Sequence, residues 1–422
     1  MSPSSHLALI NVFVGDIQGG LGPFLSTFLA ETRDWPPNNI GLVTTIAGIV
    51  TLLLSAPLGA LVDHLNRPRV LLAAACAMIL VGTLAILPAT WFFAVLIAQC
   101  LAAMGGTLLI SALSALTLGI VGKKAFPQQQ GRNQAFNHVG VLAAALVISW
   151  GSSRLGPQLA FWVLAGLSAC AIAAALTTPR TSYNRHRAVG WKEDEPDETV
   201  RKRDTYRVVF GNKRLLFVAL ALALFNLSNG PMLGLLGQKL VHDGLDGTRW
   251  TANYVIVAQL TMIPVALLAG SIADRRGRRM LLFVACAVLP VRALISALVS
   301  DPYWLIAAEI LDGVASGIVG VAVPVVVADL TWGSGRTQTA LGAVAAVQGV
   351  GGALSAWIGG LLTVWLGWTG AFLVLGLPPL ASLAILFWLE ETRGTADEPR
   401  GFFTPKDGDE EGKPEEAEPA TA

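Results

Sequence analysis

The stretch "GSIADRRGRRML", residues 270–281, places five charged side chains between two long apolar runs. These side chains belong to Asp274, Arg275, Arg276, Arg278 and Arg279. The whole chain is only 14% charged, so the cluster marks a short polar loop. An apolar helix of about 20 residues crosses the hydrocarbon core of a bilayer. The stretch therefore predicts a loop that joins two membrane-spanning helices.

The composition favours a membrane protein. The chain of 422 residues is 54% hydrophobic, with a mean hydropathy of +0.61. Soluble domains carry about 25% charged residues, and a chain of this size has too little interior to hide so much apolar sequence. No basic stripe interleaved with aromatic residues occurs, so we expect no nucleic-acid partner. The four cysteines lie singly in apolar runs, so we expect no metal site and no cofactor.

Twelve stretches are long and apolar enough to span a bilayer as helices. They are longer than the roughly 10-residue strands of a membrane barrel, so the expected fold class is all-α. In the first half they cover residues 7–30, 39–62, 70–90, 92–121, 132–151 and 158–178. In the second half they cover residues 214–241, 249–273, 280–299, 302–330, 337–366 and 369–390.

The basic residues predict the orientation of these spans. The loops after the even-numbered spans, together with the C-terminal tail, hold 24 of the 29 lysines and arginines. The opposite loops hold Arg33, Arg154, Lys239 and Arg249, and Arg292 lies inside a span. Because positively charged loops stay in the cytoplasm, we expect a multi-pass protein of the cell membrane with both termini cytoplasmic.

Two polar segments divide the chain. The expected organisation is a six-helix bundle over 1–178, a cytoplasmic linker over 179–213, a second six-helix bundle over 214–391 and a tail over 392–422. The tail is acidic and rich in Pro and Gly, so we expect it to be disordered.

The loop motif occurs twice. Residues 59–69 read "GALVDHLNRPR" and follow the second span, as the stretch quoted first follows the eighth. Gly59 matches Gly270 and Asp63 matches Asp274, each pair 211 residues apart. A repeat of six spans is typical of duplicated transporter folds.

With twelve spans, a central loop and two motif copies, the chain resembles the major facilitator superfamily over residues 7–391. The second copy matches the superfamily's G-x-x-x-D-R-x-G-R-R loop fully, whereas the first has His64, Asn66 and Pro68 at three of its positions. The resemblance implies two pseudo-symmetric bundles, a monomer, and a motif that latches the cytoplasmic gate. The gating residues are then Gly59, Asp63, Arg67, Gly270, Asp274, Arg275, Gly277 and Arg278.

Two acids lie near the centre of the membrane. At a helical rise of about 1.5 Å per residue, Asp16 is about 14 Å from the cytoplasmic end of span 1 and Asp312 about 15 Å from the outer end of span 10. The resemblance implies that these spans line a central cavity. Intramembrane carboxylates are costly and usually functional, and burial helps a carboxylate to hold a proton. Both acids are therefore expected to bind protons or substrate.

Other polar residues lie inside the spans. Arg292 and Glu309 share one depth on consecutive antiparallel helices, so we expect a structural ion pair. His138 is shallower and is expected to be a hydrogen-bonded structural residue. Buried amides bind a ligand or a neighbouring helix. The expected substrate- and proton-binding set is Asp16, Gln18, Asn226, Asn229, Gln259, Asp312 and Gln348.

These features favour a secondary transporter that moves a small organic solute by alternating access. Neither a P-loop nor a hydrolase or metalloprotease motif occurs, so we expect neither ATP-driven pumping nor an enzyme. The expected partners are the solute, protons and the lipid bilayer. The acid in span 1 resembles the arrangement in multidrug antiporters, which favours proton-coupled efflux.

Two alternatives stay open. The fourth span, with "LAAMGG" at 101–106, lacks the antiporters' arginine, and the fifth span lacks their proline. Proton-coupled uptake is therefore the second hypothesis. A non-transporting receptor or scaffold built on the same fold is the third, with its partner sites in the linker and tail.

Overall fold

The computed structural model describes residues 3–15, 22–65, 67–179, 213–330 and 337–389. Within these ranges the regular elements are helices, and no strand occurs. The all-α membrane fold predicted from the sequence is confirmed. Beyond the backbone, the structure does not describe four motif residues, which are Asp63, Gly270, Asp274 and Arg275.

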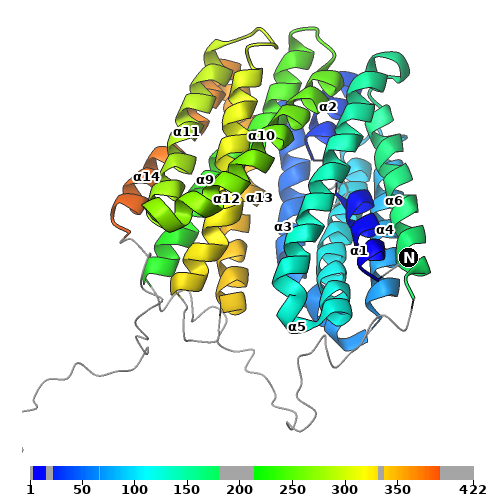
Figure 1. Cartoon of the computed structure of the whole chain (residues 1–422). Coiled ribbons are helices and arrows are strands. Elements are labelled where there is room, and N and C mark those ends of the chain that lie inside the picture. Colours follow the sequence, from blue (N-terminus) through cyan, green and yellow to red (C-terminus); the bar gives the residue numbers. More distant parts are fainter. Residues whose placement is uncertain (1–2, 16–21, 66, 180–212, 331–336, 390–422) are drawn as a thin grey trace, which may run out of the picture.

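The helices form two groups that follow each other in the sequence (Figure 1). The first group, blue to teal, contains α1 (Pro3–Val14), α2 (Gly22–Arg33), α3 (Pro37–Leu65), α4 (Pro68–Ile86), α5 (Phe92–Leu155) and α6 (Leu159–Thr177). The second group, green to orange, contains α9 (Lys213–His242), α10 (Gly247–Arg276), α11 (Arg278–Leu298), α12 (Ile306–Leu330), α13 (Thr337–Leu375) and α14 (Pro378–Phe387). We call the end at which α6 ends and α9 begins the linker side, and the opposite end the far side.

Ten stretches of the described residues are long and apolar enough to cross a membrane. The last one, Ala340–Phe387, has 48 residues and covers the eleventh and twelfth expected spans, with a break at Gly367 where φ is 70°. α5 likewise covers two expected spans, with a break at Gly122 where φ is 74°. The first expected span is two 12-residue helices, α1 and α2, on either side of residues 16–21. These helices accommodate the expected twelve spans.

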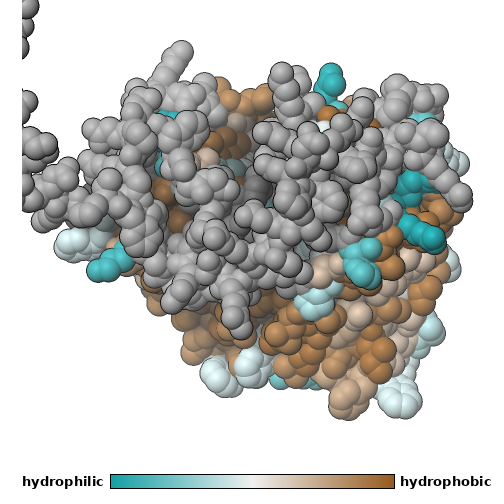
Figure 2. Space-filling view, turned by 90° about the horizontal axis from the view of Figure 1, so that it is seen from below, coloured by the Kyte–Doolittle hydropathy of each residue, from teal (hydrophilic) through white to brown (hydrophobic). Residues whose placement is uncertain are grey.

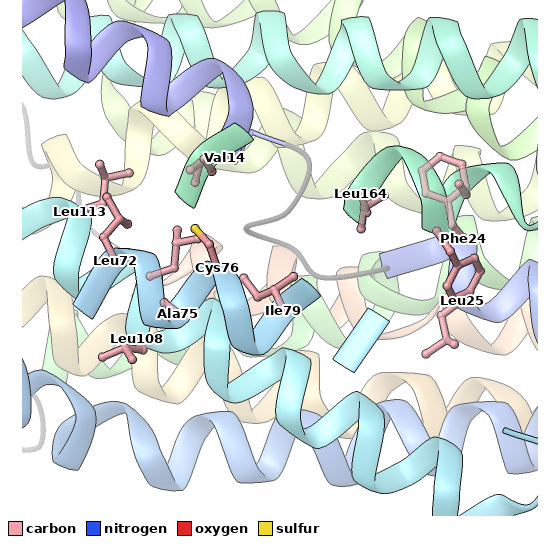
Figure 3. Close-up of a cluster of buried hydrophobic side chains, with 14 of the residues drawn as sticks. Val14, Phe24, Leu25, Leu72, Ala75, Cys76, Ile79, Leu108, Leu113 and Leu164 are labelled. Atoms are coloured by element: carbon pink, nitrogen blue, oxygen red, sulfur yellow. The ribbon is translucent and has the colours of Figure 1, made fainter. Parts of the chain in front are cut away.

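Apolar side chains lie both inside the groups and on their outer surface. Figure 3 shows part of the first core, where Leu72 and Cys76 of α4 lie among side chains of α1, α5 and α6. On the outside, Leu53, Trp150 and Leu267 are 70%, 73% and 76% exposed. Figure 2, seen from the linker side, shows mostly brown, apolar residues on the flanks that are not covered by grey atoms. A surface this apolar fits contact with lipid rather than water.

The two groups repeat the same close helix crossing. A Cβ added at Gly140 of α5 would lie 1.9 Å from the carbonyl oxygen of Val12 in α1. A Cβ added at Gly351 of α13 would lie 2.0 Å from the carbonyl oxygen of Ala223 in α9. The two glycines are 211 residues apart, and so are their two partners. The repeat seen in the loops therefore extends into the packing of the helices, where small residues allow close approach.

An arginine after each motif loop bonds to the end of the last helix of its group. Arg69 of α4 donates to the carbonyl of Leu176 in α6 at 2.6 Å. Arg279 of α11 donates to the carbonyl of Phe387 in α14 at 2.7 Å. A cation is stabilising at a helix C-terminus. Because Pro68 occupies the place that matches Arg279, Arg69 takes this role from one position later.

Replacing either crossing glycine by valine should destabilise the protein. In Gly140→Val and Gly351→Val the new side chain meets a backbone carbonyl that cannot rotate away, so each variant should lose about 1–3 kcal/mol or more of unfolding free energy. Gly166→Val is the matched control, since a Cβ at Gly166 meets nothing within 4 Å. Thermal unfolding of the purified proteins measures the difference, and equal melting of all three variants would contradict the close packing.

Candidate functional site

Hydrogen bonds join the two groups at the far side. Thr27 of α2 and Thr251 of α10 have their hydroxyl oxygens 3.1 Å apart. Thr248, also on α10, donates to the carboxylate of Glu31 in α2 at 2.9 Å. We call these four residues the far-side gate. Their contacts hold the N-terminal turns of α10 against the end of α2 and so close the space between the groups from this side.

Deeper contacts reach about half-way along the helices. His138 of α5 and Gln259 of α10 form a hydrogen bond of 2.8 Å between the groups. Toward the linker side, a Cβ added at Gly59 of α3 or at Gly342 of α13 would meet nothing within 4 Å. The hydrogen bonds named here between the groups thus lie at the far side and about half-way along the helices.

A cavity of about 340 Å³ lies between the two groups below the far-side gate. Helices α2, α3 and α5 of the first group form its wall together with α9, α11, α12 and α13 of the second. The polar side chains in this wall are Ser26, Thr44, Gln99, Asn229, Gln238, Arg292 and Asp312. Apolar residues such as Ile40, Leu233 and Leu235 complete it. The volume is in the range that holds small ligands.

Arg292 of α11 is the centre of a charge cluster on the cavity wall. Its Nη2 donates to Glu309 Oε1 at 2.9 Å, and its Nη1 donates to Asp312 Oδ1 at 2.9 Å, both on α12. Nη1 also donates to the Oδ1 of Asn229 in α9. The Nδ2 of Asn229 in turn donates to Asp312 Oδ1 at 2.8 Å. Three helices are therefore tied together by one guanidinium.

The cluster brings together residues to which the sequence analysis gave separate roles. Arg292 and Glu309, expected to pair with each other, do so, and each side chain is 1% exposed. Asp312, expected to stand alone as a cavity acid, shares the same guanidinium and lines the cavity. A charge enclosed by lipid-facing helices requires such partners, because a buried charge without one is very costly.

The charge cluster breaks the internal repeat. The residues 211 positions before Arg292, Glu309 and Asp312 cannot ionise; they are Val81, Ala98 and Leu101. Asn229 has a polar counterpart in Gln18, which lies outside the described residues. The two groups share their packing, and the second group alone carries these charges.

The other predicted amides do not line this cavity. Asn226 donates to the backbone carbonyl of Gln348 at 3.5 Å, where α9 crosses α13. Gln259 bonds to His138 between the groups. Asp16 lies, like Gln18, outside the described residues, so the structure places neither of them.

The gating motif is described only in part. Gly277 joins α10 to α11 with a φ of 97°, a value that favours glycine. Arg278 Nε lies 3.0 Å from Asp329 Oδ2 at the end of α12, an ion pair within the second group. Arg67, in the first copy, is exposed. Of the described motif arginines, Arg278 thus contacts its own group.

Two glutamines of the cavity wall were not selected from the sequence. Gln99, in "LIAQCLAA", is 8% exposed, and Gln238, in "LLGQKLV", is 5% exposed. The sequence feature that could have identified both glutamines is a lone amide inside an apolar run. Thr44 carries little such signal, because a hydroxyl in a span bonds to its own helix, here to the carbonyl of Ile40 at 3.0 Å.

Comparisons with known proteins match the chain to a family model and to related sequences. The model of the Major Facilitator Superfamily matches residues 7–331 and 251–414. An uncharacterised MFS-type transporter of Mycobacterium tuberculosis (strain CDC 1551) is 34% identical over 392 residues, which cover 93% of each chain. A gallate transporter of Pseudomonas putida is 29% identical over 185 residues, 42% of this chain and 39% of that protein.

A solved structure has the same fold. The crystal structure of the nucleoside transporter NupG matches with a TM-score of 0.75 at 16% identity. The match covers 92% of this chain and all of the NupG chain. At this identity the likeness concerns the fold alone.

Removing Arg292 should strand a buried carboxylate. Taking away one partner of a buried ion pair costs about 3–5 kcal/mol, so Arg292→Leu should unfold well below the wild-type temperature. Adding Glu309→Leu removes the stranded charge, and the double variant should regain part of the loss. Thermal unfolding measures both effects. A double variant no more stable than Arg292→Leu would mean that the pair does not hold this region together.

Proposed function

The chain belongs to the major facilitator superfamily and is a membrane transporter, and we propose that it moves a small organic solute by alternating access, coupled to protons and in the direction of efflux. One observation carries the proposal. A polar cavity lies between the two groups, with a buried guanidinium and the carboxylate of Asp312 at its wall and a closed gate above it. Such a cavity receives a solute from one side at a time.

The far-side seam is built to open and close. A Cβ added at Gly41 of α3 would lie 2.2 Å from the carbonyl oxygen of Ala356 in α13. A Cβ added at Gly360 would lie 2.3 Å from the carbonyl oxygen of Pro37. The seam thus consists of backbone against backbone, and the gate residues beside it are hydroxyls and one carboxylate, which water can satisfy when the groups separate. Opening the glycine seam or the gate hydrogen bonds therefore leaves no unpaired charge in lipid.

Proton coupling is proposed on two acids. Asp312 reaches the cavity with 16% of its side chain exposed, so a proton or a solute can approach it. Asp16 is included on its place in the sequence alone. Efflux is preferred because an acid in the first span resembles the arrangement in multidrug antiporters. Uptake with protons is the alternative, and a receptor or scaffold role is disfavoured by the family of the chain.

The finer expectations about placement belong to the same proposal. Both termini and the linker are proposed to lie in the cytoplasm, since 24 of 29 basic residues lie on that side. The protein is then a monomer of the cell membrane with bundles over 1–178 and 214–391, a linker over 179–213 and a tail over 392–422.

Proteoliposomes loaded with the pH dye pyranine test coupling and direction together. A solute added outside, without an imposed pH gradient, runs down its own gradient into the vesicle. Antiport drives protons out and makes the interior alkaline, whereas symport makes it acidic. Solutes are taken from a thermal-stabilisation screen of the purified protein, with gallate included because one relative is named for it. The absence of any solute-dependent proton movement would contradict coupling.

Asp312→Asn and Asp16→Asn should each abolish this proton movement. An amide cannot bind and release a proton in the range in which a carboxylate does. Folding should be retained in Asp16→Asn, as judged by its elution and melting temperature. Asp34→Asn is the control, because Asp34 is exposed in the loop after α2. Normal solute-driven proton movement in either variant would remove that acid from the mechanism.

Gly41→Leu should prevent closure of the far side. The added side chain collides with α13, so the protein should favour the state in which the cavity opens to the far side. A reporter cysteine at the cavity wall, Ser26→Cys, should then react several-fold faster with a membrane-impermeant maleimide added to that side. Gly166→Leu is the matched control, and proteins without the reporter measure the labelling of the four native cysteines. Unchanged labelling would show that the seam does not form the gate.

A further inference from the structure

We infer that the solute is a small organic cation, held between the carboxylate of Asp312 and the side-chain amides of Gln99 and Gln238. The inference rests on the function proposed above, because it concerns the same cavity, and it adds the chemical class of the solute. Three observations carry it: the charge that reaches the cavity, the polar groups in its wall that lack partners, and the apolar surface between them.

The charge presented to the cavity is negative. Arg292 is 1% exposed, and both of its terminal nitrogens already donate to Asn229, Glu309 and Asp312. Asp312 is 16% exposed. Its Oδ1 accepts from Arg292, from Asn229 and, at 3.5 Å, from Ser316, whereas its Oδ2 accepts no hydrogen bond from the described part of the chain. Glu309 is closed off from the cavity, so the charged group that the cavity meets is the carboxylate of Asp312.

Two amides of the wall lack partners. The Oε1 atoms of Gln99 and Gln238 are buried and have no hydrogen bond within the described structure. Both residues line the cavity, and a half-turn of the terminal amide exchanges its oxygen and nitrogen, so in the turned position each oxygen can accept from a ligand there. Gln99 comes from α5 in the first group and Gln238 from α9 in the second. A ligand that donates to both amides would bridge the two groups.

The rest of the wall selects an apolar body. Pro23, Ile40, Pro231, Leu233 and Leu235 surround the polar groups. The volume of about 340 Å³ holds a solute with a single ring or a short chain. The wall therefore fits a protonated amine that carries one further N–H or O–H donor and a compact apolar part.

An anion fits the same wall poorly. A carboxylate would find no charged donor available, because the terminal nitrogens of Arg292 are engaged and its Nε is buried. It would also lie beside Asp312, and like charges at this distance repel strongly in a medium of low dielectric constant. Gallate, for which one relative is named, is a carboxylic acid, so the inference separates this chain from that relative.

Three probes of nearly equal size test the charge preference. Tyramine, tyrosol and 4-hydroxyphenylacetate share a phenol ring and end in an ammonium, a hydroxyl and a carboxylate, so at neutral pH they are positive, neutral and negative. Each is added to the purified full-length protein, and thermal unfolding reports binding, because a ligand of the folded state raises the melting temperature. Tyramine should raise the melting temperature, tyrosol should raise it less, and the acid should leave it unchanged.

Variants locate the site. Asp312→Asn should abolish the shift with tyramine. Gln99→Leu and Gln238→Leu, which leave the charge cluster intact, should each weaken tyramine binding about tenfold, the cost of one hydrogen bond to a charged group. Gln158→Leu, the same change at an exposed position before α6, should bind as wild type does. Should Asp312→Asn fail to fold, the two glutamine variants still decide.

The inference is overturned if the acid stabilises the protein as well as the amine does, if no amine shift occurs, or if the shift survives in Gln99→Leu and Gln238→Leu. The pyranine assay distinguishes failure of this inference from failure of the proposed transport function. If the acid stabilises the protein and causes proton movement, proton-coupled transport stands and the inference of a cationic solute fails. If the amine binds at Asp312 but causes no proton movement, the cationic solute stands and proton coupling fails.

Discussion

A guanidinium enclosed by membrane helices must keep its partners, and this constraint organises the second group of helices. Arg292 satisfies it with Glu309, Asp312 and Asn229, so α9, α11 and α12 are held in one arrangement at the depth of the cavity. All these partners lie within one group. In the proposed alternating access, motion of the two groups against each other therefore leaves the cluster intact and strands no buried charge.

Contacts between the groups follow the opposite rule. They consist of hydroxyls, amides, one carboxylate, one imidazole and backbone surfaces, such as Thr27 with Thr251 and Gly41 with Ala356. Each of these groups can turn to water or pack against another small residue when the seam opens. The buried ion pairs thus lie within one group, and the contacts between the groups are hydrogen bonds and close backbone packing.

The two groups of helices share their packing but not their charged residues. The crossing of Gly140 with Val12 and that of Gly351 with Ala223 repeat after 211 residues, so the two groups share this internal geometry. The charges do not repeat. A second cluster at Val81, Ala98 and Leu101 would double the desolvation cost. The first group instead reaches the cavity with the neutral amide of Gln99, which costs far less to bury.

The sequence by itself determined the apolar spans, the loop motifs, the repeat of 211 residues and the depth of each polar residue, because rise along a helix follows from counting residues. It predicted the contact of Arg292 with Glu309, since equal depth on consecutive helices was sufficient. The tertiary structure alone decided that Asp312 shares this guanidinium, that Gln99 and Gln238 line the cavity, and that Asn226 and Gln259 turn elsewhere. The physical reason is that the direction of a side chain around its helix depends on which neighbour that face meets, and distant parts of the chain supply those neighbours.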